Sequence, residues 1–246
     1  MSEQVKILFL SANPKDISRI RLDEEVREVD EIIRMGDRRD QLELIPHLAV
    51  RPGDLRQALL RHQPHILHFS GHGSPTEGII LEDKNGNTKP VSTDALAALF
   101  RTIKDNLSVV LLNACYSVVQ AKAISKVVDF TIGMRKEIGD RSAIVFSAAF
   151  YQGLAYGRSV QESFELGVSS LMLEGIPESK TPALLSKKGA DAARTYLVAH
   201  GERRSAGEQT APPSDSAQNS LNLQGNTISA GRDVNTGNYI TTSRKN

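Results

Sequence analysis

The sequence contains one cysteine and no tryptophan, and its charges nearly cancel: 30 Lys and Arg residues stand against 29 Asp and Glu residues. A single cysteine excludes a disulfide within the chain and fits a reducing compartment. A formal net charge of +1 provides no general basic field. Composition therefore argues against nucleic acid and anionic membrane surfaces as partners.

Long hydrophobic runs are missing too. The first apolar run, Ile7 to Leu10, is too short for a signal peptide or a membrane span, so we expect a cytoplasmic protein without a membrane anchor. The chain also lacks a GxxxxGK phosphate loop, a GxGxxG turn, a GxSxG elbow and an HExxH pair. We therefore expect no cofactor and no metal ion.

What the chain does contain is a regular alternation of strand and helix patterns over its first 200 residues. Strands are predicted at Val5–Ser11, Leu42–Leu48, Ile66–Ser70, Val109–Asn113 and Phe130–Met134. Helices are predicted at Leu22–Met35, Asp54–Arg61, Ser92 (as cap) to Phe100, Ala121–Val128, Arg141–Tyr156 and Ser159–Leu173. A surface hairpin is expected from Gly78–Glu82 through the Asn85-Gly86 turn. This order predicts an α/β fold, a doubly wound, mostly parallel sheet flanked by helices.

Two apolar strands end abruptly at small polar residues, and each carries a reactive side chain just beyond its end. His72 follows the run PHILHFSGHG, and Cys115 lies in VVLLNACYS. Taken singly, such a cysteine is most often an inert buried residue, and such a histidine is most often only hydrogen-bonded. Together they are more informative, because a thiol of pKa about 8.5 needs a neighbouring base to act as a nucleophile. The backbone amides of Gly73 and Cys115 are then candidates for an oxyanion hole.

Four phrases in order, HFSGHG, LLNACYS, DFTIGMRKEIGD and SAAFYQGLAYGRSVQESF, resemble the CHAT domain family, bacterial relatives of the caspases and separases. The resemblance runs from KILFLSANP to about residue 190. It implies a caspase-like fold, with Cys115 as nucleophile and His72 as base. It also implies that the segment from Asp129 to Asp140 shapes the first specificity pocket, which makes both carboxylates candidates for selecting Arg or Lys. Asp140 could instead cap the helix that follows.

His68 lies on a strand that we expect to be covered on both faces. We therefore expect it to be a packed core residue rather than a ligand or catalytic group.

Beyond the CHAT-like region, predicted to span residues 1–200, the composition changes. Residues 201–220 are predicted to be a disordered linker, since the stretch has almost no apolar side chains to bury. Residues 221–243 repeat Gly225–Ile228 as Gly237–Ile240 and resemble the amyloid signalling motifs of bacterial and fungal immune proteins. That resemblance implies self-assembly through 221–243 and a receptor, NLR-like or other, that carries a similar motif. A β-helical adhesin unit and a disordered tail with a chance repeat are alternatives.

Taken together, the sequence predicts a cysteine endopeptidase of caspase and separase type. It would cut a protein substrate as the effector of a bacterial immune or cell-death pathway, and clustering through its C-terminal motif would activate it. The alternatives are a catalytically silent interaction module on the same fold and a polymerising scaffold that carries the protease as cargo.

Overall fold

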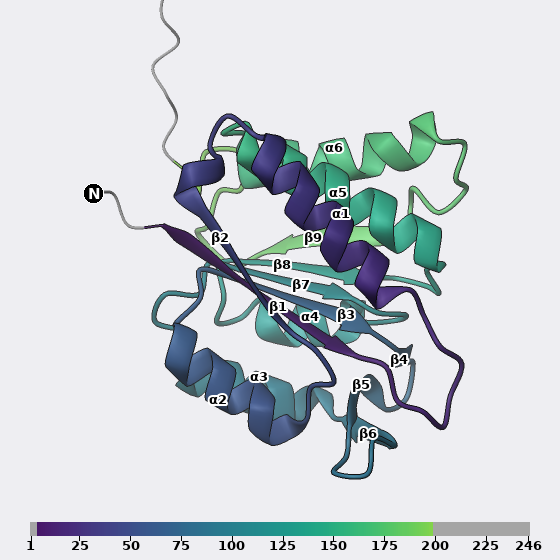
Figure 1. Cartoon of the computed structure of the whole chain (residues 1–246). Coiled ribbons are helices and arrows are strands. Elements are labelled where there is room, and N and C mark those ends of the chain that lie inside the picture. Colours follow the sequence, from purple (N-terminus) through teal and green to yellow (C-terminus); the bar gives the residue numbers. More distant parts are fainter. Residues whose placement is uncertain (1–3, 199–246) are drawn as a thin grey trace, which may run out of the picture. The chain divides into compact units, whose positions relative to one another are not determined.

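The computed structural model describes residues 4–198, and its centre is a six-stranded sheet in the order β2-β1-β3-β7-β8-β9 (Figure 1). The five strands from β2 to β8 in this order run parallel, and β9 is antiparallel to β8. Their bounds are β1 Val5–Ala12, β2 Leu42–His47, β3 Ile66–Gly71, β7 Val109–Asn113, β8 Phe130–Met134 and β9 Pro182–Ser186. The predicted doubly wound, mostly parallel α/β fold is confirmed.

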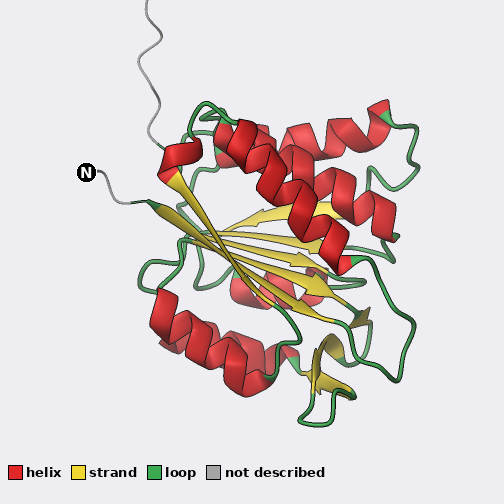
Figure 2. Cartoon of the chain, in the orientation of Figure 1, coloured by secondary structure: helices red, strands yellow, loops and turns green. Residues whose placement is uncertain are grey.

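Helices cover both faces of this sheet (Figure 2). One face carries α1 (Leu22–Met35), α5 (Asp140–Ala155) and α6 (Val160–Leu173). The other carries α2 (Pro52–His62), α3 (Thr93–Thr102) and α4 (Val118–Ile124). A short 3₁₀ helix, η1 (Arg39–Gln41), precedes β2.

The strands are apolar on both sides because each face has its own core. Along β1, Ile7 and Phe9 pack in the cluster under α1 and α5, and Leu8 and Leu10 pack in the cluster over α2. Alternate residues of a strand point to opposite faces, so a strand covered twice needs an unbroken apolar run. The same logic explains β7, whose five residues are all buried.

A second, three-stranded antiparallel sheet begins directly after His72. It consists of β4 (Gly73–Ser74), β5 (Gly78–Glu82) and β6 (Thr88–Val91), in the order β4-β5-β6. The predicted hairpin is therefore confirmed. It is not fully on the surface, however, since the middle of β5 is buried. The side-chain amide of Gln120 in α4 binds both strands of the hairpin: its Oε1 accepts from the Ile79 amide at 3.0 Å, and its Nε2 donates to the Val91 backbone carbonyl at 2.9 Å.

The other differences from prediction are local. Helix α4 begins at Val118, three residues earlier than expected, and ends at Ile124. Strands β4 and β9 were not predicted, and β6 is the return strand of the predicted hairpin. The predicted linker (201–220) and β motif (221–243) lie outside the described residues. Within residues 4–198, no helix is both long enough and apolar enough to cross a membrane.

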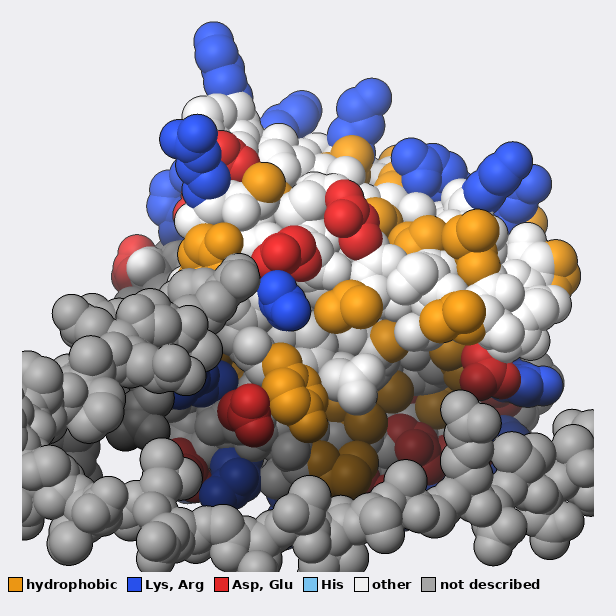
Figure 3. Space-filling model, turned by 90° about the horizontal axis from the view of Figure 1, so that it is seen from above, with side chains coloured by type: hydrophobic (Ala, Val, Ile, Leu, Met, Phe, Trp, Pro, Cys, Tyr) orange, Lys and Arg blue, Asp and Glu red, His pale blue; other side chains and the backbone are white. Residues whose placement is uncertain are grey.

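Seen from above, the layer of α1, α5 and α6 presents acidic, basic and hydrophobic side chains together (Figure 3). The exposed hydrophobic residues of α6 are Leu166, Met172 and Leu173.

Candidate active site

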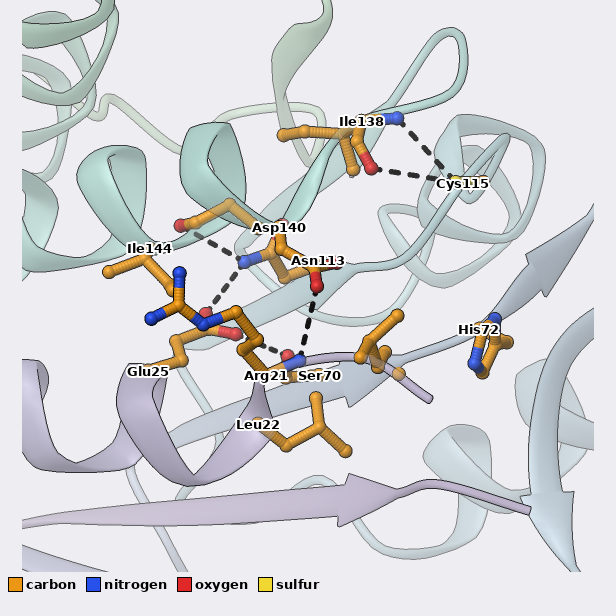
Figure 4. A pocket seen from close by; sticks show the side chains of 13 residues that line it. Arg21, Leu22, Glu25, Ser70, His72, Asn113, Cys115, Ile138, Asp140 and Ile144 are labelled. Carbon is orange, nitrogen blue, oxygen red and sulfur yellow. Dashed lines mark hydrogen bonds between the residues drawn. The ribbon is translucent and has the colours of Figure 1, made fainter. Parts of the chain in front are cut away.

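His72 and Cys115 emerge side by side because β3 and β7 are neighbouring parallel strands. Their register pairs Ser70 with Asn113, and each reactive residue lies two positions beyond its member of that pair. Both residues line one open pocket at the carboxyl edge of the sheet (Figure 4). Ligand sites of open α/β sheets form at this edge. The structure therefore brings together the two residues that the sequence singled out.

Gly73 packs directly on the backbone of Cys115. A Cβ atom at Gly73 would collide with the Cys115 carbonyl oxygen and stand 3.1 Å from the Cys115 nitrogen. Gly73 pairs with Ile79 of β5, and the Ile80 amide donates to the His72 carbonyl at 3.0 Å. In an antiparallel pair bonded in this way, the backbone groups of the opposed residues point away from each other, so the Gly73 amide points away from β5. Only glycine allows this approach, which places the two expected oxyanion donors next to each other.

The turn after Cys115 is held in an unusual backbone conformation. Tyr116 has φ +58°, a region that residues other than glycine rarely adopt. Its amide donates to the Lys136 carbonyl at 3.2 Å. Ser117 fixes the other side: its hydroxyl donates to the Leu112 carbonyl at 2.7 Å and accepts from the Met134 amide at 2.9 Å. Such strain persists only where the surroundings enforce it, and it is common next to reactive groups.

The Cys115 thiol is half-buried and lies against Ile138. The Ile138 amide donates to Sγ at 3.5 Å, and the Ile138 carbonyl accepts from Sγ at 3.8 Å. Burial raises the pKa of Cys115; the Ile138 amide offsets part of that rise, and the negative charges of Glu137 and Asp140 add to it. The resting thiol is therefore protonated at neutral pH and needs a base to become a nucleophile.

His72 is the candidate base that shares the pocket with Cys115. Its ring is half-buried, and its Nε2 atom has no hydrogen-bond partner among residues 4–198. An imidazole nitrogen without a protein partner can accept a proton from an approaching group.

The two candidate pocket carboxylates lie in different places. Asp140 lines the pocket, where its Oδ2 accepts the Arg21 amide at 3.2 Å. It is the first residue of α5 and makes no capping bond to that helix. Asp129 lies before the amino end of β8, the opposite end of the strand from the pocket, and pairs with Lys187 at 3.2 Å. Only Asp140 shares the pocket with His72 and Cys115.

Three buried polar residues that line the pocket were not identified from the sequence: Glu25, Ser70 and Asn113. Glu25 is only 2% exposed. Burial alone would raise the pKa of the Glu25 carboxyl. The opposite effect of His68, Ser70 and Ser147 together is larger, so the pKa lies below its ordinary value. The group is therefore ionised at neutral pH inside the protein.

His68 is fully buried, as predicted for a core residue. Its ring lies 4.2 Å from the ring of Phe9 and 5.7 Å from that of Tyr151, measured between centroids. Its Nε2 is 3.2 Å from Glu25 Oε1 without the alignment of a hydrogen bond. Among the described residues, no cluster of three or more His, Cys, Asp or Glu side chains is placed to hold a metal ion.

Two curated relatives are named as proteases. A "Probable protease" of Gillisia limnaea is 31% identical over 153 residues, which cover 61% of this chain and 27% of the relative. A "Roc-COR-CHAT protease" from an unknown prokaryotic organism is 24% identical over 179 residues, 70% of this chain and 17% of the relative. This chain thus spans only a minor part of the length of both proteins.

Solved structures share the fold at low sequence identity. A secreted C11 cysteine protease from Bacteroides thetaiotaomicron, in complex with an irreversible peptide inhibitor, matches with a TM-score of 0.54 and 14% identity over 74% of this chain and 66% of that one. The Arg-specific cysteine proteinase gingipain R matches with a TM-score of 0.55 and 12% identity over 78% and 48%. Residues 2–172 match the CHAT domain, and the chain belongs to the CHAT domain family.

Proposed function

We propose that the chain is a cysteine endopeptidase in which Cys115 is the nucleophile and His72 the general base. The observation that carries this proposal is the convergence of the two side chains, from adjacent parallel strands, on one pocket. The two relatives named as proteases support it. So does the fold, which this chain shares with cysteine proteases.

The proposed reaction begins when His72 takes the proton of the Cys115 thiol. The thiolate attacks the scissile carbonyl carbon, and the amides of Gly73 and Cys115 donate to the oxygen that becomes negative. His72 then gives its proton to the leaving amine as the C–N bond breaks, which leaves a thioester on Cys115. Water, deprotonated by His72, hydrolyses the thioester and restores the thiol.

The pocket beside the thiol favours a basic substrate side chain. Asp140 lies at its wall, whereas the carboxylate of Glu25, at the buried end, already accepts hydrogen bonds from Ser70, Asn113 and Ser147. Acidic groups in a confined pocket attract a guanidinium or ammonium group and repel a carboxylate. We therefore propose Arg or Lys before the scissile bond, with Asp140 as the direct contact. Asp129 is the weaker candidate because of its place at the far end of β8.

Cleavage of a peptide library tests this function. The wild-type chain should cleave peptides after Arg or Lys, and Cys115→Ala and His72→Ala should each lower the rate at least about 10³-fold. Circular dichroism and thermal unfolding should show that both variants remain folded. If Cys115→Ala cleaves at the wild-type rate, the assigned nucleophile is wrong. If the wild-type chain cleaves nothing even when artificially dimerised, a silent interaction module is the better reading.

We further propose that this peptidase is the effector of a bacterial immune or cell-death pathway and that clustering through residues 221–243 activates it. This part rests on the sequence alone. A linker of about 20 residues spans roughly 25 Å as a flexible coil, enough for protease domains to surround a fibril whose strands repeat every ~4.8 Å. Clustering raises the local concentration without any new contact between the domains.

Substitution in the repeated motif tests the clustering proposal. Ile228→Asp with Ile240→Asp should place charges in the apolar ladders and prevent fibril formation by a peptide of residues 221–242. The full-length double variant should respond only to artificial dimerisation. A wild-type peptide that stays monomeric when seeded would contradict self-assembly.

A further inference from the structure

Glu25 is a carboxylate on the buried face of a helix. The other buried residues of α1 are Leu22, Val29 and Ile33, all apolar. Burying an ionised carboxylate is costly unless donors surround it, so its partners show what it does for the fold.

The partners of Glu25 come from three different elements. Oε2 accepts the hydroxyl of Ser70 on β3. Oε1 accepts Asn113 Nδ2 of β7 at 2.7 Å and Ser147 Oγ of α5 at 2.7 Å. Asn113 Nδ2 also lies 3.0 Å from Ser147 Oγ. One side chain of α1 thus joins two strands of the sheet (Figure 4) and, through Ser147, the neighbouring helix α5.

The strand residues involved occupy equivalent positions. Ser70 lies two residues before His72, and Asn113 lies two residues before Cys115. They are also the last cross-strand pair between β3 and β7. Beyond this pair the ladder ends, and the chain enters the loops that carry the two reactive side chains. The carboxylate therefore ties the strands together at the point where their backbone pairing stops.

We propose that Glu25 is a positioning residue that sets the relative placement of His72 and Cys115. It holds the last residues of β3 and β7 in register and fastens both to α1 and α5. This inference rests on the proposed peptidase function, in which proton transfer and attack depend on the distance between these two residues. Loss of the tether lets the strand ends shift, and a displacement of about 1 Å can cost about 10²-fold in rate.

Direct contact with the substrate is a different role, and the bonding of Glu25 weighs against it. Oε1 already accepts two hydrogen bonds and lies 3.2 Å from His68 Nε2, while Oε2 accepts Ser70. With 2% of its surface exposed, little of the carboxylate is available to a ligand. Asp140, at the pocket wall, is more accessible.

Two substitutions separate these roles. In Glu25→Gln the amide oxygen can still accept from Asn113 and Ser147, and the amide nitrogen can donate to the Ser70 hydroxyl, which rotates to accept. A positioning role predicts that kcat stays within about fivefold of wild type. Glu25→Ala removes every tether, and kcat should fall about 10²-fold with little change in KM. Glu31→Gln, an exposed charge on the same helix, is the control.

If Glu25→Ala does not fold, single-tether variants test the same idea. Ser70→Ala releases β3. Ser147→Ala releases α5, which carries neither reactive residue; it also removes one acceptor of Asn113 but leaves the direct bond from Asn113 to Glu25. We expect Ser70→Ala to lower kcat more than Ser147→Ala does. The difference should be the same whether the substrate side chain before the scissile bond is basic or neutral.

Two results would overturn the inference. One is wild-type kcat in folded Glu25→Ala or in Ser70→Ala. The other is a loss in Glu25→Gln that is confined to basic substrates and appears in KM, which would make Glu25 a substrate contact. Both results require an active wild-type chain. If the wild-type chain shows no Cys115-dependent cleavage, the peptidase proposal itself fails instead.

Discussion

Cys115 and Ile138 face each other so that both backbone groups of Ile138 contact the thiol, its amide at 3.5 Å and its carbonyl at 3.8 Å from Sγ. The carbonyl accepts the S–H proton that His72 has to remove in the proposed reaction. The thiol must therefore turn away from Ile138 before it can react. The contacts with Ile138 thus hold the proposed nucleophile in a protonated resting position.

The first prediction concerns the pH dependence of that thiol. Burial and the charges of Glu137 and Asp140 raise the pKa of Cys115 above that of an ordinary thiol, so the rate of alkylation by iodoacetamide should reach half its maximum at a higher pH than that of a free cysteine. Glu137→Gln removes one negative charge and should shift the profile to lower pH. Glu165→Gln, on the exposed side of α6, should leave it unchanged. An unaltered profile in Glu137→Gln would contradict the electrostatic account.

The same raised pKa has a consequence for stability. Because the folded state holds the thiol proton more tightly than the unfolded state, the resulting stabilisation is complete below the pKa of the unfolded thiol and disappears as the pH rises through the higher pKa of the folded state. Urea unfolding of wild type and Cys115→Ala across this range should show the difference shrinking at high pH. A difference that grows with pH would have the wrong sign.

The second prediction tests the contact between Gly73 and Cys115. Gly73→Ala forces a methyl group into the Cys115 carbonyl, so it should destabilise the fold by about 1–3 kcal/mol and abolish cleavage. Gly53→Ala is the matched control, since a Cβ at Gly53 meets no atom within 4 Å and the residue lies in α2. That variant should be neutral or slightly stabilising. Normal activity in Gly73→Ala would remove the basis for an oxyanion hole at this contact.

The third prediction separates the two candidate pocket carboxylates. Asp140→Asn retains an oxygen for the Arg21 amide but loses the charge, so kcat/KM for basic substrates should fall about 10- to 100-fold relative to neutral ones. Asp129→Asn disturbs only the pair with Lys187 and should leave the preference intact. The reverse result would assign selection to Asp129.

How far the sequence predicts this structure depends on whether the decisive contacts are local. Strands β7 and β8 have the bounds predicted from their apolar runs, and α1 has the bounds predicted from its periodicity. Strand β9 escapes prediction because Pro182–Ser186 has no β-branched residue and starts with proline. Its strand conformation comes from pairing with β8, a contact that is not encoded locally.

The candidate site likewise contains residues that local sequence indicates and residues whose role depends on distant contacts. His72 and Cys115 could be identified because each follows a recognisable strand. Glu25 could not, because it lies among acidic residues of the first helical turn and resembles an exposed side chain. Its burial follows from Ser70, Asn113 and Ser147, which are 45 to 122 residues away in the chain. The only local sign is its position three residues after Leu22 and four before Val29, on the apolar face of α1.

Covalent labelling of Cys115 tests the central claim most directly. The full chain, as purified and after fusion to an inducible dimerisation domain, is treated with an arginyl acyloxymethyl ketone and analysed by intact mass and peptide mapping. The account predicts one adduct per chain, on Cys115, with labelling absent in Cys115→Ala and slowed at least about 10²-fold in His72→Ala. No adduct on Cys115 in either state, or equal labelling of wild type and His72→Ala, would contradict it.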